Sequence, residues 1–345
     1  MKTDSHIYSI DSLRFVAVFG VICLHFHPFE TISYPISVLI EQLMYFAIPF
    51  FFITSGYLFR KKIVDEGKIS GRYSKFIKRL AIVFFAWSFI YLFVPETPLI
   101  LTQAKSQGLI GGLHMVFDIN LDKIAAEPLY LFMAGTSAHL WYLFALAMTI
   151  SLLFLFIKLG IEDMFLFIAI PMYIFRVLVG PYSVTPLGIQ IDFVYYLGPF
   201  LAAVFVGIGA LIAKKDFKPS RQTAVMVILF GLGFQIAEWY LLHRIYGWDQ
   251  HRHAGFSLGT VVYGTGIFLL ALSMPAMGKS TGFFRLGQFA LGIYLIHMIF
   301  VPVAHKFYGD VPKPLGELGP FAILAASLLL TVFLMQLPYL RKIVI

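Results

Sequence analysis

The sequence has 345 residues, of which 59% are hydrophobic and only 13% are Asp, Glu, Lys or Arg, and its mean hydropathy is +0.84. Soluble domains carry about 25% charged residues, so this composition excludes an ordinary soluble domain and predicts an all-α, polytopic integral membrane protein surrounded by lipid. The net charge of +8 fits the excess of Lys and Arg in cytoplasmic loops, and we expect no nucleic-acid partner. Cys23 is the only cysteine, which excludes an intrachain disulfide.

The first apolar run covers residues 10–29, which is long enough to cross a hydrocarbon core of about 30 Å. It carries Arg14 near one end and His25 and His27 near the other. Arg14 and His25 are about three helical turns apart, so they share one face and lie roughly 16 Å apart along the axis. They are either a snorkelling arginine and a helix-end cap, or parts of a polar site at membrane depth. The spacing alone leaves both interpretations open.

Nine further hydrophobic spans follow the first, at 38–59, 80–96, 138–157, 164–180, 192–213, 222–242, 257–276, 287–307 and 321–340. With a cytoplasmic N-terminus, 18 Lys and Arg residues fall in inside segments and six in outside segments. The positive-inside rule therefore predicts about ten transmembrane helices with both termini in the cytoplasm. We expect residues 1–345 to form a single membrane domain.

Two segments between the spans carry further expectations. Residues 60–79 contain eight Lys and Arg, and we expect a basic cytoplasmic loop. That loop is either a topology anchor at the lipid headgroups or a cradle for a polyanionic ligand. Residues 97–137 form a long extracytoplasmic segment, in which we expect an interfacial helix over Leu121–Ala134. A connection of this length usually has a function, such as that of a lid or an acceptor surface.

Polar side chains recur near the outer ends of the predicted spans. Each alone is more often a satisfied partner between helices, but together they indicate a polar chamber in the outer half of the bilayer. The set is His25, His27, Glu41, His139, Arg176, Asp192, Glu238 and His305, and His297 lies nearer mid-depth.

Several familiar site patterns are missing from the sequence. It contains no His or Cys cluster with metal-ligand spacing, and we expect no metal. Three Gly-x-Gly patterns, at 207–209, 231–233 and 264–266, lie inside apolar spans and favour helix packing over dinucleotide binding. Ser55-Gly56 is expected to allow close helix approach in the same way.

Four short motifs resemble those of the integral membrane acyltransferase 3 family, and they occur in the family's order over most of the chain. They are Arg14-x10-His25, Phe50–Leu58 (FFFITSGYL), His139–Leu143 (HLWYL) and Gly292–His297 (GIYLIH). The resemblance implies an O-acetyltransferase that moves an acetyl group from cytoplasmic acetyl-CoA, as acyl-CoA donor, to a hydroxyl of an extracytoplasmic glycan or lipid-linked sugar. It also implies a bacterial cytoplasmic (inner) membrane location. The chain looks like the compact stand-alone members that modify surface polysaccharide precursors.

The resemblance also suggests roles for individual residues. Acyl transfer needs a base near the acceptor alcohol, and histidine takes and returns a proton near neutral pH. His25 is therefore the candidate base, while His139 and His297 are further candidate site residues. The residues do not decide whether His25 deprotonates the acceptor directly or carries the acyl group itself.

The expected donor-binding residues are cationic. Arg14 is expected to orient the donor, and the other expected contacts are Lys75, Lys78, Arg79 and Arg285. Family members often have paired arginines where this chain has Lys75, Lys78 and Arg79. A lysine cannot clamp a phosphate bidentately, so this is a departure from the family pattern.

Two other functional classes fit the residues. Polar side chains at depth, with Pro49, Pro171 and Pro199 inside spans, suit a transporter of a small polar or glycolipid substrate, although we see no internal repeat. A non-catalytic membrane module that binds a glycan or drug-like ligand is the third class. Loss of activity with intact binding after a change of His25 distinguishes the enzyme from such a module.

Overall fold

The computed structural model describes residues 6–30, 32–66, 69–191, 198–248, 255–309 and 315–344. All regular secondary structure in these ranges is helical, which confirms the all-α class. The chain forms two compact units: unit 1 comprises Met1–Ala17, Gln42–Phe76 and Ala145–Gly287, and unit 2 comprises Val18–Glu41, Ile77–Phe144 and Gln288–Ile345. Four α-helices of the described part of the chain contribute residues to both units, namely α1 (Tyr8–Phe26), α2 (Tyr34–Met44), α4 (Ile69–Tyr91) and α8 (Trp141–Lys158).

Within the described ranges, six helical stretches are long and apolar enough to cross a membrane. They are Tyr8–Phe26, Tyr34–Lys62, Ala138–Lys158, Arg221–Tyr246, Phe283–Tyr308 and Leu315–Gln336. Two further apolar helices, Pro199–Lys214 and Leu258–Ser273, are shorter. These helices support an integral membrane protein, while the count of about ten and the cytoplasmic termini stay predictions.

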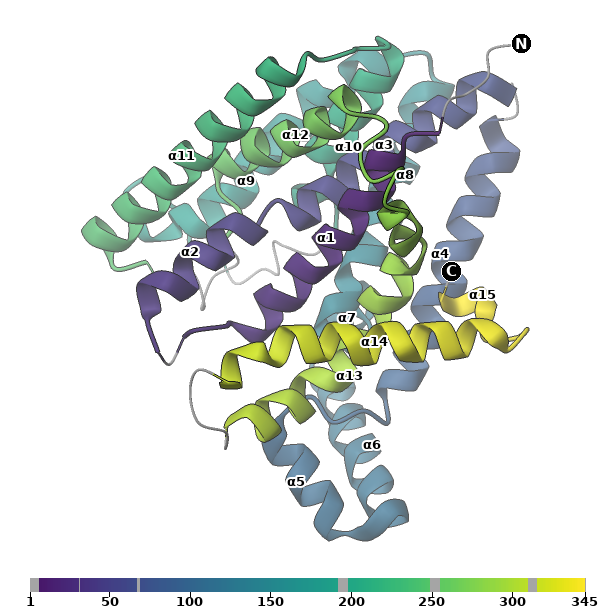
Figure 1. The fold of residues 1–345 in the computed structure, drawn as a ribbon, viewed down its shortest axis with the longest axis vertical. Helices are drawn as coiled ribbons and strands as arrows, with labels where there is room; N and C mark the ends of the chain where they lie inside the picture. The colour runs from purple at the N-terminus through teal and green to yellow at the C-terminus, as the bar shows by residue number, and fades with distance from the viewer. Residues whose placement is uncertain are drawn as a thin grey trace. The chain divides into compact units, whose positions relative to one another are not determined.

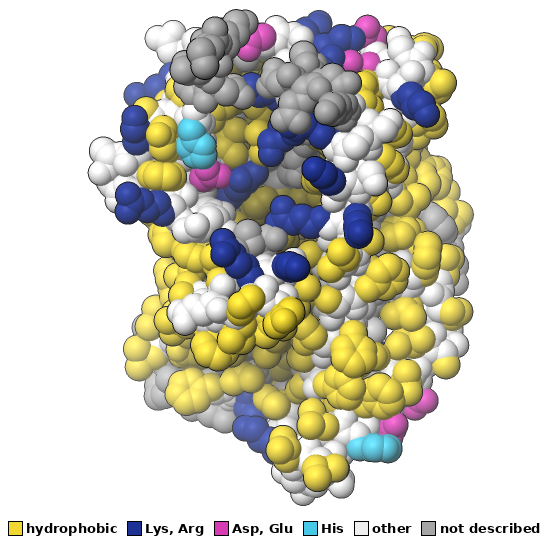
Figure 2. Space-filling view, turned by 90° about the vertical axis from the view of Figure 1, so that its right-hand side faces the viewer, with side chains coloured by type: hydrophobic (Ala, Val, Ile, Leu, Met, Phe, Trp, Pro, Cys, Tyr) yellow, Lys and Arg dark blue, Asp and Glu magenta, His cyan; other side chains and the backbone are white. Residues whose placement is uncertain are grey.

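The exposed surface of several helices is strongly apolar. Phe85 and Phe89 on α4 are 66% and 63% exposed, and Leu229 and Phe230 on α11 (Arg221–Tyr246) are exposed to a similar degree. Figure 2 shows hydrophobic side chains over much of the visible face, with Lys and Arg side chains gathered in one part of it. Such extended apolar area is costly in water and is the surface that lipid tails would cover.

Two helices of unit 1 touch almost backbone to backbone. These are α3 (Ala47–Glu66) and α10 (Pro199–Lys214). A Cβ on Gly56 would lie 2.1 Å from the carbonyl oxygen of Val206, and a Cβ on Gly209 would lie 2.0 Å from that of Ile53. No side chain larger than hydrogen fits at either contact, so the packing role expected for both glycines is confirmed.

Helices α11 and α12 (Leu258–Ser273) also belong to unit 1 and lie side by side (Figure 1). The Glu238 carboxylate on α11 accepts hydrogen bonds from the Ser257 hydroxyl at 2.7 Å and from the Gly259 N–H at 2.5 Å. Helix N-termini leave unpaired N–H groups, so this carboxylate satisfies the start of α12.

Unit 2 contains the other helix pairs. In Figure 1, α13 (Ala290–Gly309) packs against α14 (Gly319–Gln336), and α5 (Pro98–Ser106) and α6 (Gly108–Ala126) form a helical hairpin. Helix α9 (Phe165–Val179), in unit 1, packs on α10.

Residues 60–79, expected to be a basic cytoplasmic loop, are largely helical, so the expected loop conformation is wrong, while their cytoplasmic location stays a prediction. Helix α3 continues to Glu66 and α4 begins at Ile69, and only 67–68 lie outside the described residues. Arg, Lys and Glu are good helix formers, so the helices extend past the apolar runs. The basic side chains are therefore carried on two helix ends.

The expected helix over Leu121–Ala134 is also wrong as a single element. Helix α6 ends at Ala126, and a separate helix α7 (Pro128–Ala134) begins at Pro128. Proline has no N–H for an internal helical hydrogen bond but fits the first turn of a new helix. The chain therefore turns a corner at Glu127.

Candidate active site

Unit 2 brings three histidines together from distant parts of the sequence. His25 lies in the last turn of α1, His139 in the short 3-10 helix η1 (Ala138–Leu140), and His297 on α13. The ring centroids of His25 and His297 are 5.3 Å apart, and those of His139 and His297 are also 5.3 Å apart. The three predicted site histidines thus form one cluster centred on His297, which we call the histidine cluster.

The members of the histidine cluster differ in exposure. His139 is 2% exposed and His297 is fully buried, whereas His25 is only half-buried. His25 is therefore the most exposed member of the cluster.

The proton on His297 is fixed by a backbone contact. Its Nδ1 lies 2.6 Å from the carbonyl oxygen of Tyr294, one turn earlier on α13. Because a carbonyl only accepts, Nδ1 is the donor, and in the neutral ring the lone pair is on Nε2. That Nε2 is buried and has no hydrogen-bond partner within the described part of the chain. The rings of Tyr294 and His297 also lie 6.0 Å apart between centroids, while the Tyr294 hydroxyl donates to another residue.

His139 is held by hydroxyl groups on several elements. The Ser137 hydroxyl lies 3.0 Å from its Nδ1, and the Tyr294 hydroxyl donates to its backbone carbonyl. The ring of Tyr91, on α4, meets the His139 ring edge-on at 5.0 Å, and the Tyr91 hydroxyl donates to the Leu295 carbonyl at 2.7 Å. These bonds tie α4 and η1 to α13 around the cluster.

Sequence reasoning missed Tyr91. It lies in no motif, and the only available signal is a tyrosine inside an apolar span, where its hydroxyl needs a buried partner.

Arg14 is in unit 1 and already has a partner there. Its Nη1 is 2.7 Å from Oδ1 of Asp11, whose other oxygen lies 2.8 Å from Nε2 of His6. The prediction that Arg14 and His25 lie on one helix is confirmed, because α1 is continuous from Tyr8 to Phe26. The Asp11 partner was missed, although its i, i+3 spacing from Arg14 signals such a pair.

Arg285 lies on a segment of unit 1 that packs along the first turns of α1. The Phe283 ring meets the Phe15 ring at 5.5 Å, and a Cβ on Gly287 would lie 2.1 Å from the Asp11 carbonyl oxygen. Arg285 itself is exposed. Unit 1 therefore brings Arg285 to the part of α1 that carries Arg14.

The other predicted donor-binding residues are exposed on α4. They are Lys75, Lys78 and Arg79. By contrast, Arg60 on α3 is in an ion pair with Glu162, at 2.5 Å between Nε and Oε1.

A second ion pair lies beside the one that Arg60 makes with Glu162. Lys214 is 2.6 Å from Oδ1 of Asp163, and its hydrogen bond lowers the pKa of that carboxyl. Arg60 and Lys214 thus hold helix ends together and are less suited to bind an anion.

Other residues of the expected polar chamber have structural partners. In unit 1, Arg176 is fully buried and donates to the Phe256 carbonyl, next to the Glu238 contacts at the start of α12. In unit 2, the His305 ring stacks on Phe26 at 4.7 Å. Asp192 lies outside the described residues. The structure therefore favours the satisfied-partner interpretation for Arg176 and Glu238.

His27 lies just beyond the end of α1 and is paired with Glu41 in unit 2. Its Nδ1 is 2.8 Å from Oε1 of Glu41, which is only 1% exposed. Burial alone would lower the pKa of His27, but the hydrogen bond and charge of Glu41, with the charge of Glu30, outweigh it and raise that pKa above its ordinary value of 6.5. The pair joins the turn after α1 to α2.

The comparison with family models agrees with the motif resemblance. The model of the acyltransferase 3 family, which is described as an acyltransferase domain, matches residues 7–340 of the 345-residue chain. Searches of curated proteins and of solved structures each return no match. The family match covers Arg14 and all three members of the histidine cluster, and it extends over almost the whole chain. The chain therefore belongs to the acyltransferase 3 family of membrane acyltransferases.

Proposed function

We propose that the protein moves an acetyl group from acetyl-CoA in the cytoplasm to a hydroxyl of an extracytoplasmic glycan or lipid-linked sugar, in a bacterial inner membrane. Family membership supports acyl transfer in general. The donor, the acceptor and the direction across the membrane are the specific content of the proposal.

The observation that carries the proposal is the contact between His25 and His297. His25 is half-buried, so an acceptor hydroxyl can approach its imidazole, and His297 packs behind it at a centroid distance of 5.3 Å. A general base must lie within hydrogen-bond reach of the proton that it removes. His25 is accessible in this way, whereas His139 and His297 are buried.

The proposed reaction is a direct transfer. His25 removes the proton of the acceptor hydroxyl as the hydroxyl oxygen attacks the thioester carbonyl carbon, forming a tetrahedral oxyanion. The C–S bond then breaks, the acetyl ester remains on the acceptor, and the CoA thiolate takes the proton back from His25. General acid–base catalysis of this kind contributes about 10² to 10⁴ in rate.

The cationic residues supply the proposed donor contacts. Arg14 lies on α1, and Arg285 lies on the segment that packs along the first turns of α1. The exposed bases of α4 add further positive charge. CoA carries phosphates, which arginine grips through its planar fork and lysine attracts as a point charge. We propose that these residues bind and orient acetyl-CoA while His25 acts on the acceptor.

The test compares two histidine variants of detergent-purified protein. His25→Ala should lower transfer from acetyl-CoA to a glycan acceptor by about 100-fold or more, because the base is lost. Acetyl-CoA binding, measured by calorimetry, should change little. The matched control is His114→Ala on α6, because His114 is 76% exposed and lies outside the histidine cluster.

Two results would count against the proposal. Near-normal transfer by His25→Ala would make the Arg14-x10-His25 motif structural in this protein. Equal loss of transfer in the His114→Ala control would show that the effect is not specific to the cluster.

A further inference from the structure

Unit 2 contains an open cavity of about 300 Å³ next to the segment that carries His139. Its lining comes from the connection after α4, from α6 and α7 with Glu127 between them, and from the segment that leads into η1; the residues are Glu96, Asn120, Lys123, Ile124, Ala126, Glu127, Tyr130, Leu131, Gly135, Thr136 and Ala138. We call it the corner pocket, because it lies where α6 and α7 meet at Glu127. None of its residues is used by the chemistry proposed for the histidine cluster.

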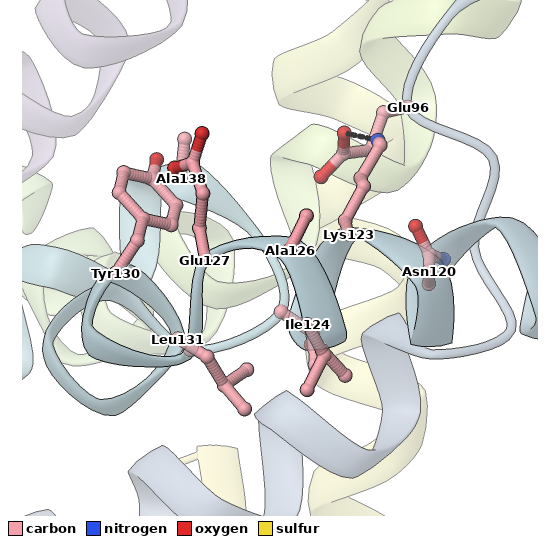
Figure 3. Close-up of a pocket in the computed structure, with 11 residues that line it drawn as sticks. Glu96, Asn120, Lys123, Ile124, Ala126, Glu127, Tyr130, Leu131 and Ala138 are labelled. Atoms are coloured by element: carbon pink, nitrogen blue, oxygen red, sulfur yellow. Dashed lines mark hydrogen bonds and ion pairs between the residues drawn. The ribbon is translucent and has the colours of Figure 1, made fainter.

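The polar groups of the corner pocket gather on one side. Figure 3 shows Tyr130, Glu127 and the pair formed by Lys123 and Glu96 projecting to the same side of the α6–α7 corner. Lys123 Nζ lies 2.5 Å from Oε2 of Glu96, and the two side chains remain 50% and 30% exposed. The pocket thus offers carboxylates, an ammonium group and an aromatic ring to one ligand.

The charge and polarity of the pocket exclude two classes of ligand. Two carboxylates, Glu96 and Glu127, face one lysine, so the formal charge of the lining is −1. A phosphate-bearing ligand such as CoA would be repelled, and a lipid tail would offer the Glu127 carboxylate no hydrogen-bond donor. The lining instead suits a neutral ligand rich in hydroxyl groups, which donates to carboxylates and packs its C–H face on Tyr130.

The walls of the pocket are fixed to the elements that hold His139. Asn120 Nδ2 donates to the carbonyls of Tyr91 and Leu92 at 3.2 and 3.1 Å, which ties α6 to the end of α4. Tyr91 in turn packs against His139. Ala138 lines the pocket and directly precedes His139 in η1. A ligand in the corner pocket is therefore one residue along the chain from the histidine cluster.

The connection between α7 and η1 is also held in place. Gly135 has a φ of 68°, and a Cβ there would lie 2.5 Å from the Ser88 hydroxyl oxygen. The Thr136 hydroxyl donates to the Ser88 carbonyl. This wall is pre-formed, as in most small-molecule sites, which begin at about 300 Å³.

We infer that the corner pocket binds a monosaccharide unit of the acceptor and so presents its hydroxyl to the histidine cluster. The inference rests on the proposed function, because it names the class of acceptor and the residues that select it. Glu127 and Glu96 accept hydrogen bonds from sugar hydroxyls, and Tyr130 packs against the face of the ring.

The test is photolabelling of the purified full-length protein. The probes are diazirine derivatives of glucose, galactose, N-acetylglucosamine and rhamnose, and labelled peptides are located by mass spectrometry. At least one probe should label residues 120–138 saturably, and an excess of the same unmodified sugar should compete with it. Labelling of other segments alone, or no saturable labelling by any of the four probes, would overturn the inference.

Variants of the pocket make the test quantitative. Tyr130→Ala and Glu127→Gln should each raise the probe concentration for half-maximal labelling by about tenfold, as expected for loss of one good polar or ring contact. The matched control is Leu129→Ala, because Leu129 is 60% exposed on α7 and does not line the pocket. An equal effect in the control would contradict the inference. Specific labelling in a protein that transfers no acetyl group would instead count against the proposed function alone.

Discussion

Nδ1 of His297 donates a hydrogen bond to the backbone carbonyl of Tyr294, 2.6 Å away, and this leaves the buried Nε2 as the unprotonated nitrogen of the neutral ring. The Nε2 acceptor of His297 therefore lies in the histidine cluster without a hydrogen-bond donor among the described residues.

The first prediction concerns His297→Asn. An asparagine amide can still donate to the Tyr294 carbonyl, so the melting temperature should change by only a few degrees, but the imidazole ring that packs behind His25 is lost. We expect kcat to fall by about 100-fold and its pH dependence to change shape. Full pH–rate profiles of the wild type, of His297→Asn and of the exposed control His114→Asn measure this. If His297→Asn had the same pH–rate profile as the wild type, His297 would have only a packing role.

The second prediction separates Arg14 from His25. Arg14→Ala should raise the KM for acetyl-CoA more than it lowers kcat, and Arg14→Lys should restore only part of the affinity because the planar fork is lost. Asp11→Asn is the companion variant, since Asp11 already occupies the Arg14 guanidinium and would repel donor phosphates. It should tighten donor binding or leave it unchanged. Weaker binding in Asp11→Asn would contradict a donor role for this pair.

The third prediction concerns the bases on α4. Reversing Lys75, Lys78 and Arg79 to Glu should weaken acetyl-CoA binding at low ionic strength, and the difference should shrink in about 0.5 M salt because exposed charges are screened. The control is Lys218→Glu, because Lys218 is 83% exposed in another part of the chain. If the triple variant bound acetyl-CoA as tightly as the wild type, these residues would not bind the donor and would serve as a topology anchor.

The fourth prediction concerns topology. Single cysteines at Lys62 and Leu109, in a Cys23→Ala background, should react with an impermeant thiol reagent from opposite sides of the membrane. Both positions are exposed, and the difference follows from the excess of Lys and Arg in the predicted inside segments. If both cysteines reacted from the same side of the membrane, the arrangement of ten spans would be wrong.

The fifth prediction uses the pair between His27 and Glu41. Because this contact raises the pKa of His27 above 6.5, its stabilisation is fully present below pH 6.5 and is lost as the pH rises through the raised pKa. His27 has a φ of 53°, a conformation that asparagine tolerates, so His27→Asn is the matched variant. The wild type should exceed His27→Asn in melting temperature most at about pH 6, and the difference should narrow towards pH 9. A difference that is constant over this range would contradict a charged His27.

Much of the fold follows from apolar runs, and much of the site from short motifs. His25, His139 and His297 were each predicted from a separate motif, but their spacing in the sequence gives no information on their distances in space. That information depends on how α1, η1 and α13 pack. Tyr91 and Asn120, which tie these elements together, lie in no motif, and their partners are backbone carbonyls that any sequence could supply.

The errors have local causes. The run of bases at 60–79 was expected to be a loop because it is charged, whereas the helix propensities of its residues favour continued helix. The expected helix over Leu121–Ala134 crossed Pro128, whose preference for a first helical turn was the available signal. Burial likewise could not be predicted, since a glutamate such as Glu238 serves a helix terminus only once another helix is beside it.

The contact of α3 with α10 at Gly56 and Gly209 has a consequence for motion. With no side chain between the two backbones, neither helix can slide along the other without first separating from it. The pair is therefore expected to move as one rigid body during turnover, with no sliding between α3 and α10.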